Sequence, residues 1–151
     1  MDWKCAHRTR IQMRYSDTDM MGHINNAAYA QFLELARMDY LDHLLPPGAR
    51  PASMVLARLE LNYRQEVRLG QQVEVLTLLS HVGNSSWSYA FQLLADGLLS
   101  ADGSSVQVHT DPQTRRSAPL PALVREGLLA ALYPEAELSQ GAELSLEAAR
   151  G

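Results

Sequence analysis

The sequence has only one cysteine, Cys5, among its 151 residues, and this scarcity excludes several kinds of protein. A single cysteine cannot form a disulfide within the chain, and nothing around it has the ligand spacing of a zinc site. The first residues, M-D-W-K-C-A-H-R-T-R-I-Q-M, lack the apolar stretch of a signal peptide. No segment approaches the roughly 18 apolar residues that a membrane-spanning helix needs. We therefore expect a cytoplasmic protein with no membrane partner.

An excess of basic residues is also missing. Lys and Arg number 13 against 17 Asp and Glu, which gives a formal net charge of −4. Because phosphate binding needs a basic surface, we expect no nucleic-acid partner. The hydrophobic fraction of 46% and the charged fraction of 20% are those of an ordinary globular protein. The length fits one domain, which we place at residues 1–135, followed by a tail at residues 136–151.

Several catalytic motifs are absent as well. The chain contains no G-x-S-x-G segment and no glycine-rich phosphate loop, and its five histidines lack the spacing of zinc proteases. The D-T-D-x-x-G segment that begins at Asp17 is similar to the start of a calcium-binding loop. Such a loop needs an oxygen donor at its fifth position and Glu at its twelfth, where this chain has Met21 and Ala28. We therefore expect no metal site.

The hydrophobic pattern predicts a strand, a long helix and then a series of strands. Apolar residues alternate in the first segment and recur every three or four residues in the second, and Pro46 ends the helix. Turn residues such as Gly83-Asn84 and Asp96-Gly97 separate the later strands, and Asp102-Gly103 indicates a bulge. The predicted strands are 8–15, 53–67, 71–82, 85–95 and 98–110, and the predicted helices are 25–45 and 122–132.

These elements predict an α+β fold in which a curved antiparallel sheet wraps around the long helix, with a short C-terminal helix. Three long strands joined by tight turns are antiparallel neighbours. One long helix needs a sheet to cover its apolar face, and the sheet needs the helix for the same reason. The outer edge of such a sheet is free to pair with a second copy of the chain, so we expect a dimer.

The most polar segment, S-D-T-D-M-M-G-H-I-N-N-A-A-Y, lies immediately before and within the start of the long helix. Asp17 follows a strand and is suited to organising a turn, and Asn25 is suited to capping the helix. Asp19 lies a few residues before the helix, where free N–H groups carry partial positive charge. A carboxylate there can face an electrophile, and the N–H groups can stabilise an oxyanion. This is the minimum equipment for hydrolysing an acyl group.

The same segment, Y-S-D-T-D-M-M-G-H-I-N-N-A-A-Y followed by F-L-E-L-A-R, resembles the signature of hot-dog-fold acyl-CoA thioesterases of the 4-hydroxybenzoyl-CoA thioesterase class. The later N-Y-R-Q-E-V-R-L-G-Q-Q-V-E-V resembles the central strand pair of that family, and T-R-R-S-A-P-L-P resembles its approach to the last helix. The resemblance covers roughly residues 8–132. It implies a homodimer at minimum, with a homotetramer expected, and an active site at the dimer interface.

The resemblance also implies roles for individual residues. Asp19 matches the catalytic acidic residue and would act as nucleophile or as general base for water; the sequence leaves both routes open. His23, Asn25 and Asn26 match the positions just before the helix and would position the substrate or form the oxyanion site. The residues expected to line the substrate pocket are Tyr15 and Tyr29, and those expected to bind the phosphates of CoA are Arg64, Arg68, Arg115 and Arg116.

We therefore expect an acyl-CoA thioesterase that needs no metal or organic cofactor. An acyl-carrier-protein thioesterase and a non-catalytic acyl-CoA-binding hot-dog domain remain alternatives. A hot-dog dehydratase is disfavoured, because Glu34 and Asp39 do not form a recognisable version of its His and carboxylate pair.

Overall fold

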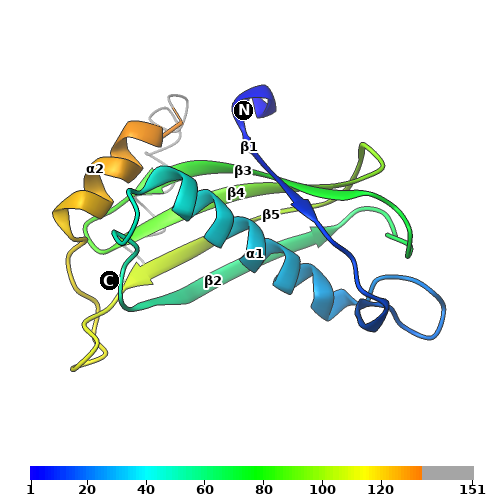
Figure 1. Ribbon diagram of the computed structural model, residues 1–151, viewed down its shortest axis with the longest axis horizontal. Helices are drawn as coiled ribbons and strands as arrows, with labels where there is room; N and C mark the ends of the chain where they lie inside the picture. Colours follow the sequence, from blue (N-terminus) through cyan, green and yellow to red (C-terminus); the bar gives the residue numbers. More distant parts are fainter. Residues whose placement is uncertain (134–151) are drawn as a thin grey trace.

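The computed structural model describes residues 1–133, and the predicted tail at residues 136–151 lies outside the described part. Five antiparallel strands form one curved sheet in the order β1-β3-β4-β5-β2, and the long helix α1 lies across one face of it (Figure 1). The predicted α+β hot-dog architecture is confirmed. The elements are η1 Trp3–Cys5, β1 His7–Ile11, η2 Tyr15–Asp17, α1 Asn26–Leu44, β2 Met54–Tyr63, β3 Val73–Val82, β4 Ser86–Ala95, β5 Leu98–His109 and α2 Ala122–Ala131.

The long helix begins and ends where its sequence predicts. The side chain of Asn25 accepts a hydrogen bond from the N–H of Ala27, which caps the first turn. Leu45 ends the helix, and prolines follow it. The helix buries a continuous stripe against the sheet, formed by Ala28, Tyr29, Phe32, Leu33, Ala36, Arg37, Tyr40 and Leu41. All of these are apolar or aromatic except Arg37.

The central strands supply the opposite side of this core. Strand β4 buries Trp87, Tyr89, Phe91 and Leu93, every second residue, in the same core as α1. The turn between β4 and β5 has positive φ at both central residues, 49° at Asp96 and 79° at Gly97, as a two-residue hairpin requires. The predicted meander of β3, β4 and β5 is therefore confirmed.

The bulge predicted at Asp102-Gly103 is wrong. Both residues pair in regular register with β2 and β4, and the register shift in β5 falls at Ser100 instead. Glycine is needed at position 103 for a different reason, because a Cβ atom there would lie 1.9 Å from the carbonyl oxygen of Glu60 on β2. This glycine permits a close approach of the two strand backbones.

The first strand is shorter than predicted. It ends at Ile11, and the chain enters a short helical turn at Tyr15–Asp17, where the backbone N–H of Arg14 donates to the Asp17 carboxylate. The alternation that continues to Tyr15 in the sequence therefore does not continue as a strand.

Strand β2 is one edge of the sheet. It pairs with β5 on one side, and no other described strand pairs with its second side. Apolar side chains stay accessible along it: Val55 is 50% exposed and Leu56 is 45% exposed. Of the helices in residues 1–133, none is long and apolar enough to cross a membrane.

Candidate active site

A cleft of about 310 Å³ opens between the start of α1 and the segment that follows β2. We call it the Asp19 cleft. It is lined by Asp19, His23, Ile24, Asn26, Tyr29, Tyr63, Arg64, Gln65, Glu66 and Val67. The structure thus brings together five residues predicted for the site: Asp19, His23, Asn26, Tyr29 and Arg64.

The two aspartates of the D-T-D segment lie in different environments. Asp17 is 4% exposed, and its carboxylate accepts hydrogen bonds from the backbone N–H and the guanidinium of Arg14. Burial alone would raise the pKa of Asp17, but these hydrogen bonds and the charge of Arg14 outweigh it and hold the pKa below its usual value. Asp17 is thus a structural residue of the turn, in agreement with the role that its position after a strand predicts.

Asp19 is exposed and lines the cleft. Its Oδ1 atom accepts hydrogen bonds from the N–H of Met21 at 2.8 Å and from the N–H of His23 at 3.1 Å. No described residue donates a hydrogen bond to its Oδ2 atom. One oxygen therefore fixes the orientation of the carboxylate, while the other remains available to a molecule in the cleft.

Backbone hydrogen bonds hold the loop that carries Asp19. The N–H of Asp19 donates to the carbonyl of His23 at 2.8 Å, and Gly22 has the positive φ of 75° that this tight turn requires. The N–H of Ile24 donates to the carbonyl of Val67 at 2.7 Å. The N–H of Leu69 donates to the carbonyl of Gly22. The loop is thus tied to the segment after β2, which forms the other wall of the cleft.

The first turn of α1 includes a backbone donor that has no acceptor among the described residues. The side-chain oxygen of Asn25 accepts a hydrogen bond from the N–H of Ala27, and the backbone carbonyl of Asn25 accepts one from the N–H of Ala28 at 2.8 Å. The N–H of Asn26 has no acceptor within residues 1–133, and Asn26 lines the Asp19 cleft. The N-terminal end of a helix favours negative charge, so this N–H is suited to bind an oxyanion.

The side chain of His23 points to the far wall of the cleft. Its Nε2 atom lies 3.4 Å from Oε2 of Glu66, while its backbone N–H and carbonyl both contact Asp19. The backbone of His23 therefore holds the Asp19 carboxylate in its orientation, and its ring contacts the segment after β2.

Two tyrosines, Tyr29 and Tyr63, line the Asp19 cleft. Tyr29 is 3% exposed, and its ring meets that of Tyr63 edge to face with a centroid distance of 5.0 Å. The hydroxyl of Tyr63 donates to the carbonyl of Asn26 at 3.1 Å, which links β2 to the start of α1. Burial raises the pKa of Tyr29, so its hydroxyl stays protonated.

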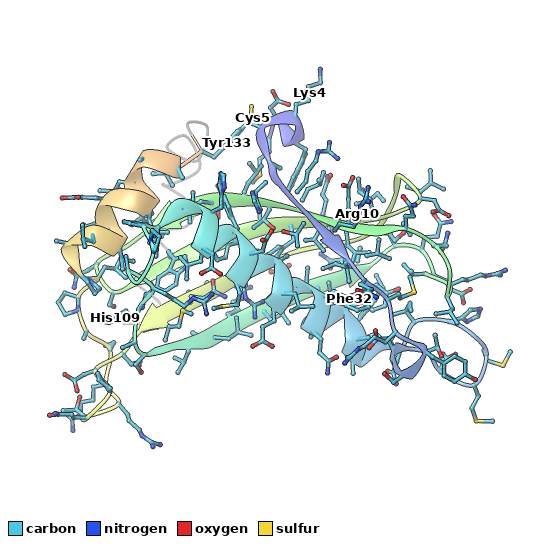
Figure 2. The ribbon with its side chains drawn as sticks, viewed as in Figure 1. Lys4, Cys5, Arg10, Phe32, His109 and Tyr133 are labelled. Atoms are coloured by element: carbon cyan, nitrogen blue, oxygen red, sulfur yellow. The ribbon has the colours of Figure 1, made fainter. Side chains whose placement is uncertain are left out.

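Some predicted site residues lie elsewhere in the single chain. Tyr15 is 83% exposed and does not line the Asp19 cleft, because the strand that would have oriented it ends at Ile11. Arg115 and Arg116 follow β5, whose last residue, His109, lies far from the start of α1 (Figure 2). Within one subunit they cannot bind the same phosphate group as residues of the cleft.

The two other predicted arginines lie near the cleft. Arg64 lines it and forms an ion pair with Asp102, with its Nε atom 3.1 Å from the carboxylate. Arg68 is exposed just outside it, and its backbone bridges to that of His23. Both arginines are placed to contact an anionic part of a ligand that extends out of the Asp19 cleft.

Reasoning from the sequence missed Tyr63, Gln65, Glu66 and Val67, which form one wall of the cleft. They belong to the N-Y-R-Q-E-V segment, which resembles part of the family's central strand pair, but the sequence points only to Arg64 within it and to Arg68 directly after it. Their position depends on the pairing of β2 with β5, so no local pattern identifies them. No group of three or more His, Cys, Asp or Glu residues in the described part of the chain could hold a metal ion.

Comparison with known proteins gives a consistent result. The sequence profile of the thioesterase-like superfamily matches residues 13–132. The long-chain acyl-CoA thioesterase FadM of Escherichia coli (strain K12) is 29% identical over 126 residues, which cover 80% of this chain and 96% of that protein. A solved thioesterase complexed with coenzyme A and Zn, from Thermus thermophilus, superposes with a TM-score of 0.71 at 34% identity, covering 80% of this chain and 95% of the other. A predicted thioesterase from Bacillus stearothermophilus superposes with a TM-score of 0.74 at 31% identity, covering 83% and 96%.

Proposed function

Because this chain belongs to the thioesterase-like superfamily, and is therefore a thioester hydrolase, we propose that it acts on acyl-CoA thioesters with Asp19 as its catalytic residue. The reaction converts an acyl-CoA and water to a free acid and CoA. We further propose that it works as the 4-hydroxybenzoyl-CoA thioesterase class does, on the basis of its D-T-D-M-M-G-H-I-N-N segment. The observation that carries the proposal is that Asp19 and Asn26 line one cleft, while Oδ2 of Asp19 and the N–H of Asn26 have no hydrogen-bond partner within residues 1–133.

In the general-base route, Oδ2 of Asp19 accepts a proton from a water molecule while the water oxygen bonds to the thioester carbon. The carbonyl oxygen becomes an oxyanion and accepts a hydrogen bond from the N–H of Asn26. The C–S bond then breaks, and the sulfur leaves with the electron pair and takes the proton from Asp19. A preformed donor of this kind is worth roughly 3–4 kcal/mol in well-studied enzymes.

In the nucleophilic route, Oδ2 of Asp19 itself bonds to the thioester carbon and the CoA thiolate leaves. The resulting mixed anhydride is then hydrolysed by water, which restores the carboxylate. Both routes use the same two groups of the protein. They differ in whether Asp19 forms a covalent bond to the acyl group.

The choice of CoA as the thiol is supported by two relatives, one of which is described as an acyl-CoA thioesterase and the other as a complex with coenzyme A. CoA carries a pyrophosphate and a 3′-phosphate, for which arginine side chains are suited. Arg64 and Arg68 lie at the cleft of the same subunit. Arg115 and Arg116 would contact CoA only from another subunit, because they lie at the opposite end of the sheet.

We also propose that the chain forms a homodimer through β2, and that dimers assemble further into a tetramer. Strand β2 has an unpaired edge and carries exposed Val55 and Leu56. A second β2 strand, antiparallel to the first across a two-fold axis, would pair that edge and continue the sheet.

The proposal is tested by measuring thiol release from a panel of aliphatic and aromatic acyl-CoAs of different lengths. Hydrolysis of at least one of them at a rate well above the spontaneous rate is expected. Comparison of CoA with acyl carrier protein as the thiol, for one acyl chain, separates the two kinds of thioesterase. Binding of acyl-CoA without any hydrolysis across the panel would instead favour a non-catalytic binding domain and overturn the proposal.

A further inference from the structure

A second cavity, of about 120 Å³, lies between the second half of α1 and the start of β2, above β4 and β5. We call it the Arg37 pocket. Its apolar walls come mainly from Met38, Leu41, Met54 and Leu56. The other lining residues are Glu34, Arg37, Val55, Trp87, Tyr89 and Gln107.

The Arg37 pocket contains three buried polar atoms that have no hydrogen-bond partner among the described residues: Nη1 of Arg37, Nε1 of Trp87 and the hydroxyl oxygen of Tyr89. The exposed fractions of these side chains are 8%, 0% and 1%. The indole N–H of Trp87 lies near the Tyr89 hydroxyl without completing a hydrogen bond of normal geometry. A buried guanidinium nitrogen without an acceptor is costly, so the position of Nη1 of Arg37 beside an apolar wall indicates an acceptor that the single chain does not supply.

The surroundings of Arg37 determine what kind of group fits. Burial lowers the pKa of Arg37 and the nearby carboxylate of Glu34 raises it, but Glu34 is exposed and forms no ion pair with it. An arginine side chain stays charged in any case. Gln107, the remaining polar group of the floor, is hydrogen-bonded to Ser105. What remains is the charged donor of Arg37 and the phenol O–H of Tyr89, which the Trp87 indole N–H faces; together they match an anionic group with several acceptor oxygens.

The position of the Arg37 pocket connects it with the proposed chemistry. Within one subunit, Arg37 lies eleven residues along α1 from Asn26, about 16 Å at 1.5 Å per residue. Strand β2 links both sites, since Tyr63 at its end lines the Asp19 cleft and Met54 at its start lines the Arg37 pocket. If two β2 strands pair antiparallel about their centres, Met54 lies opposite the partner subunit's Tyr63. The Arg37 pocket of one subunit then adjoins the Asp19 cleft of the other.

We propose that the Arg37 pocket binds a carboxylate at the far end of the acyl group, so that the enzyme prefers thioesters of dicarboxylic acids. This inference rests on the proposed function and on its β2-mediated dimer. The thioester carbonyl lies at Asn26 of one subunit, and the acyl chain crosses the interface. Its terminal carboxylate accepts hydrogen bonds from Arg37 and Tyr89 of the other subunit.

The test compares acyl-CoAs of equal carbon number that differ only at the far end, such as adipyl-CoA with hexanoyl-CoA and suberyl-CoA with octanoyl-CoA. We expect the wild-type protein to give the higher kcat/KM on the carboxylated member of at least one pair. Arg37→Met should lower that kcat/KM by about 10- to 100-fold, the usual effect of a lost hydrogen bond to a charged group. The value for the neutral member should change by no more than a few-fold.

Further variants separate recognition from structure. Glu34→Gln changes another residue that lines the Arg37 pocket without removing a hydrogen-bond donor, so it should not reduce the preference for the carboxylated substrate. Tyr89→Phe should reduce it less than Arg37→Met does, and Arg37→Lys should restore part of it. Thermal unfolding of each variant checks the fold. Calorimetric binding of adipyl-CoA to Asp19→Asn, with and without Arg37→Met, measures recognition in the absence of turnover.

The outcomes are distinguishable. Equal rates on both members of every pair, or an equal loss on both in Arg37→Met, would overturn this inference and leave the proposed function standing. The Arg37→Met dimer could instead dissociate with no selective loss of kcat/KM on the carboxylated substrate. That result would mean that the partner subunit supplies the missing acceptor, and it would also overturn this inference. Absence of turnover on every acyl-CoA would mean that the proposed function itself has failed.

Discussion

At the scale of single residues, the environment of each aspartate in the D-T-D segment decides what it does. Asp17 is enclosed, and both of its oxygens accept hydrogen bonds from Arg14. Asp19 keeps one oxygen unused in an open cleft. Two chemically identical side chains, two positions apart, are therefore suited to a structural and to a catalytic role.

The first prediction concerns Asp19→Asn. The amide oxygen can still accept hydrogen bonds from Met21 and His23, so the loop should keep its conformation. The variant has no carboxylate oxygen to take a proton or to attack the thioester, so kcat should fall by at least about 10²-fold, as is typical when a general base is removed. Thiol-release kinetics measures the loss, and calorimetry should show that acyl-CoA still binds.

Asp17→Asn is not a neutral control for this experiment, because the Asp17 carboxylate holds the turn that comes directly before Asp19. Asp19→Ala serves better as a second variant. An unimpaired rate in Asp19→Ala would remove Asp19 from the mechanism. It would leave the family assignment unaffected.

At the scale of secondary-structure elements, the strongest local patterns were sufficient and the long-range ones were not. The three- and four-residue period, Asn25 and Pro46 predicted α1 to within a residue or two at each end. The end of β1 was predicted too late, because the turn made by Asp17 overrides an alternation that continues past Ile11. The bulge in β5 was misplaced because register depends on the neighbouring strands, which the local sequence does not specify.

The same limit applied to the site. The residues before α1 were found because they are close in sequence and polar, whereas Tyr63 and Glu66 reach the Asp19 cleft only through the pairing of β2 with β5. The sequence does not distinguish Arg64 and Arg68, which lie near the cleft, from Arg115 and Arg116, which do not, since this depends on the end of the sheet that each occupies.

The second prediction belongs to the contact between β5 and β2. Gly103→Ala introduces a Cβ atom 1.9 Å from the carbonyl oxygen of Glu60, a backbone atom that cannot move away without separating the strands. We expect a loss of stability of about 2–4 kcal/mol, at the upper end of the range for overpacking. Chemical denaturation measures it, and Ser104→Ala, one position further along the same strand, is the control that should change stability by much less. A Gly103→Ala protein as stable as the wild type would contradict the close approach of these strands.

At the scale of the whole molecule, acidic pH should destabilise the fold through several carboxylates at once. Hydrogen bonds from Arg14 outweigh the burial of Asp17 and lower its pKa. The pKa of Asp39 is lowered chiefly by the hydroxyl of Thr9. A carboxyl group whose pKa is lower in the folded protein stabilises the fold above its unfolded pKa and loses that contribution as the pH falls through the folded value.

The third prediction concerns the pH dependence of stability. The free energy of unfolding should be nearly constant from neutral pH to about pH 5 and should fall as the pH drops below the ordinary aspartate value of 3.8. Asp17→Asn, which does not titrate, should be less stable at neutral pH and should lose less stability on acidification. Urea denaturation at a series of pH values measures both effects. An identical pH dependence in the two proteins would mean that Asp17 does not contribute.

The fourth prediction concerns assembly through β2. Val55 on this edge strand and Leu129 on α2 are both 50% exposed, which makes them a matched pair. Val55→Glu should place unpaired charges in the β2 interface, separate the subunits that pair there and lower the sedimenting mass toward the chain mass of 16.8 kDa. Leu129→Glu should leave the oligomer unchanged. Sedimentation velocity distinguishes these results, and a wild-type protein that sediments as a monomer would refute the dimer.

The order of the strands also bears on how the protein folds. β3, β4 and β5 are joined by short turns and can form from contacts between near neighbours in the chain, whereas β1 and β2 join the sheet only after long loops have closed. Amide hydrogens of the three central strands should therefore exchange with deuterium most slowly, and those of the two edges sooner. Since the Asp19 cleft is built from the segments that follow β1 and β2, it should be the last part of the molecule to assemble and the first to open. On gradual warming, enzymatic competence should vanish before the bulk of the β structure melts.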